Sequence, residues 1–176
     1  LYTSGTSGTP KGVVSPILDE ADAKKLWSEE IEQWSFCAKD VHLVCSPLYH
    51  SAPIRLSLST LLAGGSIVVP GKFKADEIVK SIRQTQPTTT FCTPTHLQRL
   101  VESGHIGELG SLRLVLHAGS KCEDKLKRIV INEIGINKVW EFYGSTEGQF
   151  SVCSSTEWLD RPGTVGKARR NRKLLV

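Results

Sequence analysis

Apolar residues along this chain follow two alternating patterns. Five short runs rich in apolar or β-branched residues predict strands, at residues 41–45, 66–70, 88–92, 112–117 and 138–142. Segments with apolar residues three or four positions apart predict helices, at residues 17–39, 55–63, 75–86, 94–104 and 122–134. Alternating strands and helices are typical of an α/β fold, with a mainly parallel sheet flanked by helices.

The first of these helices has the clearest local signals. Asp19 and Asp22 suit an N-cap or a first turn. Trp27 and Trp34 fall on its apolar face, where we interpret both as core anchors rather than as rings that stack on a ligand.

The first fourteen residues, LYTSGTSGTPKGVV, contain a loop suited to a polyphosphate, between two short strands. Glycines let the backbone approach a ligand, hydroxyl and backbone N–H groups donate hydrogen bonds, and Lys11 adds a positive charge. The Walker A pattern does not fit, because Gly12 follows the lysine. A flexible linker is the alternative. The candidate phosphate-binding residues are Thr3, Ser4, Gly5, Thr6, Ser7, Gly8, Thr9 and Lys11.

Three further loops follow predicted strands, and they contain His50, Gly119 and residues 143–147. In a parallel sheet such loops meet along one edge, where open α/β sheets bind ligands. Tyr143-Gly144-Ser145-Thr146-Glu147 offers an aromatic face for a base, hydroxyls for a phosphate and a carboxylate for Mg²⁺. A plain surface turn is the alternative, and a lone histidine such as His50 is more often structural than catalytic.

Composition narrows the class of protein. With 39% hydrophobic and 23% charged residues, the 176 residues fit one domain or part of one. A net charge of +4 without a basic stripe does not indicate nucleic acid, and we interpret the basic residues of 167–173 as a solvated turn between strands. No G-x-S-x-G motif supports a serine hydrolase.

The five cysteines are widely spaced, with no C-x-x-C pair, and indicate reduced thiols in a cytoplasmic protein rather than a metal site. The sequence has no apolar run of membrane-spanning length and no signal peptide, although a peripheral membrane contact stays open. It also contains no methionine. We therefore expect an internal fragment of a longer protein.

Four motifs in order resemble the adenylate-forming superfamily of acyl-CoA synthetases, luciferases and peptide-synthetase adenylation domains, and most closely its acyl-CoA ligases. Residues 2–12 are similar to the phosphate loop of that family, Pro47-Leu48-Tyr49-His50 to its aromatic-histidine motif, residues 143–147 to its Y-G-x-T-E motif, and residues 163–167 to its G-[ST]-V-G-K segment. The resemblance spans the chain and implies the central part, residues 1–176, of an AMP-binding domain.

The resemblance implies a two-step reaction with ATP, Mg²⁺ and CoA. A carboxylate attacks the α-phosphate of ATP, which gives an acyl-adenylate and pyrophosphate, and the thiol of CoA then displaces AMP. Thr3 to Lys11 would hold the β- and γ-phosphates, Tyr143 would stack on adenine, and His50 would lie near the reacting carboxylate. Thr146 would contact the α-phosphate, Glu147 would bind Mg²⁺, and Gly119, Ser120 and Lys121 would line the nucleotide pocket.

Other parts implied by the resemblance lie outside residues 1–176: a ribose-binding Asp, a hinge residue, a C-terminal lysine and a preceding subdomain. Many members of the family also carry Ala or Pro within the segment that here reads Ser120-Lys121-Cys122. We expect a fatty or other lipophilic acid as substrate, and an isolated fragment without turnover. The alternatives are an aryl- or amino-acid-activating enzyme, a non-catalytic nucleotide-binding relative, and a truncated product that acts through protein contacts.

Overall fold

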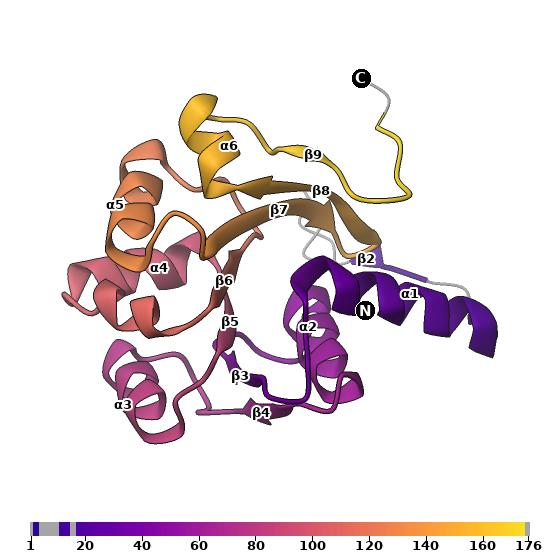
Figure 1. The fold of residues 1–176 in the computed structure, drawn as a ribbon, viewed down its shortest axis with the longest axis horizontal. Coiled ribbons are helices and arrows are strands. Elements are labelled where there is room, and N and C mark those ends of the chain that lie inside the picture. The colour runs from indigo at the N-terminus through magenta and orange to yellow at the C-terminus, as the bar shows by residue number, and fades with distance from the viewer. Residues whose placement is uncertain (1, 4–10, 15–16, 175–176) are drawn as a thin grey trace.

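A seven-stranded sheet forms the centre of the computed structural model, which describes residues 2–3, 11–14 and 17–174. Its strand order is β4-β3-β5-β6-β7-β8-β9, and the five strands from β4 to β7 are parallel (Figure 1). The bounds are β3 (Val41–Val44), β4 (Ser66–Val68), β5 (Thr89–Cys92), β6 (Leu114–His117), β7 (Val139–Ser145), β8 (Gly148–Ser154) and β9 (Lys167–Ala168). The mainly parallel α/β fold is confirmed.

Helices cover both faces of the sheet. On one side lie α3 (Ala75–Thr85), α4 (Pro94–Glu102) and α5 (Asp124–Ile134), and on the other α1 (Glu20–Trp34) and α2 (Ser51–Leu62) (Figure 1). A 3₁₀ helix, Ile106–Ser111, precedes β6, and α6 (Ser155–Asp160) follows β8. No helix in the described part of the chain is long and apolar enough to cross a membrane.

Two buried clusters hold these layers together. Leu43, Val115 and Val130 belong to the larger one, and Trp34, Phe91 and Phe142 to the smaller one. Trp34 is buried as predicted and donates a hydrogen bond from Nε1 to Glu30, at 2.8 Å. Trp27 is only half-buried, so its prediction as a core anchor is wrong in part.

The helix predicted at residues 17–39 is shorter in the structure, where α1 runs from Glu20 to Trp34, but its predicted N-cap is confirmed. Asp19 is the N-cap, and its Oδ1 accepts a hydrogen bond of 2.8 Å from the backbone N–H of Asp22. The start of α2 differs from the prediction, because the helix begins at Ser51 and not at Arg55. His50 is therefore the residue immediately before a helix.

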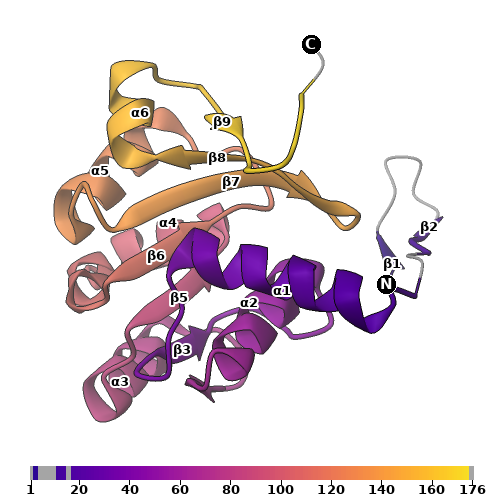
Figure 2. The same cartoon turned by 45° about the vertical axis from the view of Figure 1, so that its right-hand side comes forward.

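The first two strands, β1 (Tyr2–Thr3) and β2 (Lys11–Gly12), pair antiparallel (Figure 2). The predicted flanks of the phosphate loop are therefore strands. Its centre, residues 4–10 with Ser4, Gly5, Thr6, Ser7, Gly8 and Thr9, lies outside the described residues.

The strand that was predicted to end at Phe142 continues as β7 to Ser145 and turns into β8, which the sequence did not predict. The two strands pair antiparallel, with a register shift between Tyr143 and Gly144. A Cβ on Gly144 would lie 2.4 Å from the Gly148 carbonyl oxygen, so only glycine fits this close approach. The predicted turn at residues 143–147 is thus the tip of a hairpin.

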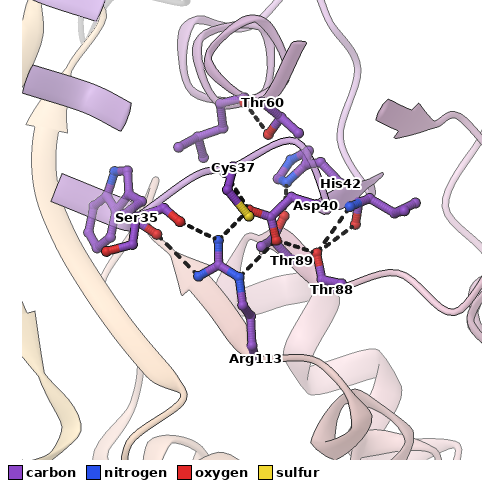
Figure 3. A network of polar contacts seen from close by, with 11 residues as sticks. Ser35, Cys37, Asp40, His42, Thr60, Thr88, Thr89 and Arg113 are labelled. Atoms are coloured by element: carbon purple, nitrogen blue, oxygen red, sulfur yellow. Dashed lines mark hydrogen bonds and ion pairs between the residues drawn. The ribbon is translucent and has the colours of Figure 1, made fainter. Parts of the chain in front are cut away.

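At the amino-terminal edge of the parallel strands, Arg113 connects the sheet to the end of α1 (Figure 3). Its guanidinium donates to both carboxylate oxygens of Asp40, at 2.8 and 2.5 Å, and to the carbonyls of Trp34 and Ser35, at 3.2 and 3.1 Å. Thr88 donates to the same carboxylate at 2.6 Å. This polar network closes the edge opposite to the predicted ligand loops.

The basic tail is the predicted solvated turn in part, because Arg170, Arg172 and Lys173 are exposed and residues 170–171 form a turn, but Arg169 departs from the prediction. Arg169 is buried, with Nη1 2.8 Å from the Glu30 carboxylate and 2.5 Å from Oε1 of Gln149. The tail therefore packs against α1 through a buried ion pair with a residue 139 positions earlier.

Candidate functional site

The carboxyl ends of β3, β5, β6 and β7 border one cavity of about 470 Å³. It brings together five of the predicted site residues, His50, Gly119, Gly144, Ser145 and Thr146. Because these residues come from three loops far apart in the sequence, the strand-edge prediction is confirmed for their placement.

A second cavity of about 330 Å³ adjoins the first. It is bordered by Ser120, Lys121 and Tyr143 from the predicted set, and by Thr164 and Val165 of the segment before β9. The two cavities share Gly119, Phe142 and Gly144. A ligand of two parts can therefore lie across Gly119 and Gly144, with one part in each cavity.

Gly119 turns the chain sharply between the two cavities. Its φ of +98° is a conformation that side-chain-bearing residues rarely adopt. A Cβ at this position would lie 3.7 Å from the Thr93 methyl group, so the turn passes close to the end of β5.

The tyrosine of the hairpin presents its ring to solvent at the second cavity. Tyr143 is 56% exposed, and the Phe150 ring centroid lies 6.1 Å away at an angle of 55°. An exposed ring backed by another aromatic is suited to stacking on a planar heterocycle.

Glu141 also borders the second cavity and was not predicted as a site residue. Its carboxylate pairs with Lys127 of α5, which is almost fully buried and lies 4.9 Å from the Trp158 ring centroid. The ion pair with Lys127 therefore stabilises the negative charge of Glu141 at the inner wall of this cavity.

The histidine at the first cavity is exposed beside another aromatic ring. The ring centroids of Tyr49 and His50 lie 4.5 Å apart. His50 is also the N-cap residue of α2, although its side chain makes no capping hydrogen bond. Ser51, Ala52 and Pro53 of the first helical turn border the same cavity. This places the positive end of the α2 dipole beside it, which favours a bound anion.

Glu147 does not border either cavity but lies at the hairpin tip beside Thr146. The pKa of the Glu147 carboxyl is lowered mainly by a hydrogen bond from the Ser145 side chain, and also by one from the backbone of Glu147 itself. The group is therefore ionised at neutral pH. No cluster of three or more His, Cys, Asp or Glu side chains that could hold a metal occurs in the described part of the chain.

Sequence reasoning missed several residues at the first cavity. Thr93 directly follows β5 and Ser46 lies two residues after β3, so the strand-edge rule could have identified both. Phe91 and Phe142, stacked with centroids 5.7 Å apart, are buried and looked like ordinary core residues. Of the predicted phosphate loop, only the backbone of Thr3 and Lys11 is described.

A parallel sheet with a glycine turn, an exposed tyrosine and paired cavities at its carboxyl edge is the arrangement in which open α/β domains bind their ligands. The sequence profile of the AMP-binding enzyme family matches residues 1–176. The chain belongs to that family, which confirms the resemblance seen in its motifs.

Named relatives are CoA ligases for different acids. The chain is 34% identical over 155 residues to a 4-chlorobenzoate–CoA ligase of Pseudomonas sp. (86% of this chain, 29% of that protein). It is 31% identical over 153 residues to a medium/long-chain-fatty-acid–CoA ligase of Mycobacterium tuberculosis (86% and 26%). The chain thus spans between a quarter and a third of the length of these relatives.

Solved structures agree on the fold. The ATP-bound MatB of Rhodopseudomonas palustris superposes with a TM-score of 0.78 at 28% identity, over 97% of this chain and 33% of that one. The o-succinylbenzoate CoA synthetase of Bacillus subtilis in complex with its acyl-adenylate intermediate superposes with a TM-score of 0.80 at 23% identity, over 96% and 34%.

Proposed function

We propose that this chain is the central part of the AMP-binding domain of a longer, AMP-forming acid–CoA ligase. The observation that carries the proposal is the pair of adjoining cavities that meet at Gly119 and Gly144. An acyl-adenylate has two parts joined at a phosphate, and it suits this arrangement. The acyl group would occupy the larger cavity beside His50, and the adenosine the smaller one beside Tyr143.

In the first half-reaction, a carboxylate oxygen attacks the α-phosphorus of ATP and the bond to the β-phosphate oxygen breaks, which releases pyrophosphate. The chain's own residues would act by positioning and charge neutralisation. Thr146 would donate to the α-phosphate, and the loop from Thr3 to Lys11 would hold the departing phosphates. In the second half-reaction, the CoA sulfur attacks the acyl carbon and AMP leaves.

The residues present fit an ATP-bound Mg²⁺. Mg²⁺ is commonly held by one or two carboxylates together with phosphate oxygens, so the single ionised carboxylate of Glu147 beside Thr146 is sufficient. When bound, the ion would neutralise charge on the phosphates. Ser120 and Lys121 would line the adenosine side.

The acid is proposed to be lipophilic, with a role in fatty acid metabolism. Phe91, Ala118 and Phe142 form the inner wall of the larger cavity, and all three are apolar and buried. An aryl acid is the second candidate, favoured by the stacked Phe91 and Phe142 rings. The five free cysteines of the described chain are compatible with a cytoplasmic enzyme.

The test is ATP–pyrophosphate exchange by the full-length protein, with octanoate, palmitate, benzoate, 4-chlorobenzoate and a set of amino acids. Exchange that depends on octanoate or palmitate supports a fatty acid, and exchange with benzoates alone supports an aryl acid. Exchange with amino acids only would exclude a lipophilic acid.

A non-catalytic nucleotide-binding relative is the competing function. The coding sequence beyond Val176 separates the two. A ligase requires the ribose-binding Asp and the late lysine implied by the family resemblance, and a protein that lacks both would bind nucleotide without activating an acid.

A further inference from the structure

His96 connects two walls of the larger cavity, although no partner for it could be predicted from the sequence. It lies in the first turn of α4, and its ring stacks on Phe73 with centroids 4.1 Å apart and planes at 12°. This stacking fixes the plane of the ring, so its two nitrogens point in defined directions.

The Nδ1 atom of His96 faces two donors. The backbone N–H of Thr93 donates to it at 3.3 Å, and the Ser46 hydroxyl lies 3.5 Å away. In return, Oγ1 of Thr93 accepts from the backbone N–H of His96 at 3.3 Å, which completes a capping box. The pKa of His96 is lowered to about 4, mainly because the ring is buried and also because the positive charge of Arg99 lies nearby. The ring is therefore neutral near pH 7 and can accept.

The two donors belong to the cavity wall. Ser46 lies two residues after β3, Thr93 directly follows β5, and both border the cavity beside His50. The Thr93 methyl group also lies against the Gly119 turn. One ring thus joins the ends of two neighbouring parallel strands at the place where the proposed acid binds.

We propose that His96 is a positioning residue, which holds Ser46 and Thr93 in the geometry that the acid substrate requires. The proposal rests on the proposed function of the larger cavity. The smaller cavity shares Gly119 but contains neither Ser46 nor Thr93, so binding of the nucleotide should depend little on His96.

The test compares two substitutions in the full-length protein. His96→Phe keeps a ring to stack on Phe73 but removes the acceptor, and His96→Gln keeps an acceptor at a position where capping boxes commonly have one. His105→Gln is the matched control, because His105 lies away from both cavities and pairs with the exposed Asp76. Initial rates of ATP–pyrophosphate exchange are measured with octanoate and with 4-chlorobenzoate.

His96→Phe should raise the KM for the acid about tenfold, the effect expected for losing one or two hydrogen bonds, and leave the KM for ATP within about twofold. His96→Gln should restore most of the acid KM, and His105→Gln should change neither constant. Equal rises of both KM values in His96→Phe, or no difference between the Phe and Gln variants, would overturn the proposal.

A second measurement does not depend on activity. Hydrogen exchange of the Thr93 N–H should be at least about tenfold faster in His96→Phe than in wild type, and near wild type in His96→Gln. Equal rates in all three proteins would overturn the proposal. If the wild-type protein shows no pyrophosphate exchange with any of the acids tested, the proposed function fails. The hydrogen-exchange rates of the Thr93 N–H still decide whether His96 positions the cavity wall.

If His96→Phe does not fold, Phe73→Leu replaces it. This change removes the stacking that orients the ring and keeps the acceptor, so we expect a rise of about threefold in the acid KM. An unchanged acid KM in Phe73→Leu would contradict the positioning role.

Discussion

Asp40 and Arg113 form a two-point ion pair that closes the sheet edge opposite to the candidate site (Figure 3). The Asp40 side chain is 2% exposed. Arg113, the residue immediately before β6, extends its side chain to this carboxylate. Burial alone would raise the pKa of Asp40, but hydrogen bonds from Arg113 and Thr88 outweigh burial and lower the pKa to about 2.

Arg113→Met should destabilise the protein by about 3 kcal/mol, because it leaves a buried carboxylate without its partner. Asp40 has a lowered pKa, so it stabilises wild type by roughly 2 kcal/mol above pH 4, and this contribution is lost as the pH falls toward 2. Urea unfolding at pH 7 and at pH 3 measures both effects. Arg83→Met, which removes an exposed ion pair, is the control. Equal losses in the two variants would contradict a special role for Arg113.

Two glycines of the segment before β9 should differ sharply in their tolerance of alanine. Gly166 has φ +81°, and a Cβ there would lie 1.9 Å from the Val152 carbonyl oxygen, whereas Gly163 has φ +88° and open space around it. Gly163→Ala should cost about 1 kcal/mol from its backbone conformation, and Gly166→Ala at least about 3 kcal/mol because β8 must also shift. Urea unfolding compares them, and similar losses would mean that β9 does not pack as described.

Tyr143→Ala should raise the KM for ATP about tenfold, because stacking of a base on an aromatic side chain contributes about 1–3 kcal/mol. Tyr143→Phe keeps the ring and should stay within twofold of wild type. The acid KM should change little in either variant, since Tyr143 borders only the smaller cavity. Pyrophosphate exchange at varied ATP measures the effect, and a loss in Tyr143→Phe as large as in Tyr143→Ala would assign the role to the hydroxyl.

Lys11→Ala should slow adenylate formation more than thioester formation, because pyrophosphate departs only in the first step. Rapid mixing of enzyme, ATP and acid measures the first rate, and addition of CoA to preformed acyl-adenylate measures the second. Equal slowing of both steps would indicate that Lys11 has only a structural role.

The sequence was sufficient to predict the parallel part of the sheet, because each of those strands is a short apolar run between amphipathic helices. It also placed His50, Gly119 and Tyr143 at one edge, since this follows from parallel strand direction alone. Such reasoning uses only local pattern and topology.

The remaining features depend on contacts between distant residues. Residues 148–154 contain polar residues at Gln149, Ser151 and Ser154, and they form β8 because the turn at Thr146 and Glu147 folds them back onto β7. Arg169 is buried because Glu30, far away in the sequence, pairs with it. His96 gains its role from Phe73 and Ser46, which no local pattern connects to it.

The step that defines the proposed reaction is the attack of a carboxylate oxygen on the α-phosphate of ATP at the junction of the two cavities. The most direct measurement uses octanoate, or 4-chlorobenzoate, with both carboxylate oxygens labelled as ¹⁸O, together with ATP, Mg²⁺, CoA and the full-length protein. Mass spectrometry of the nucleotide product should show AMP with one ¹⁸O atom, transferred when the acyl–phosphate bond forms and CoA then cleaves the acyl carbon–oxygen bond. Unlabelled AMP, or ADP with labelled inorganic phosphate, would contradict it.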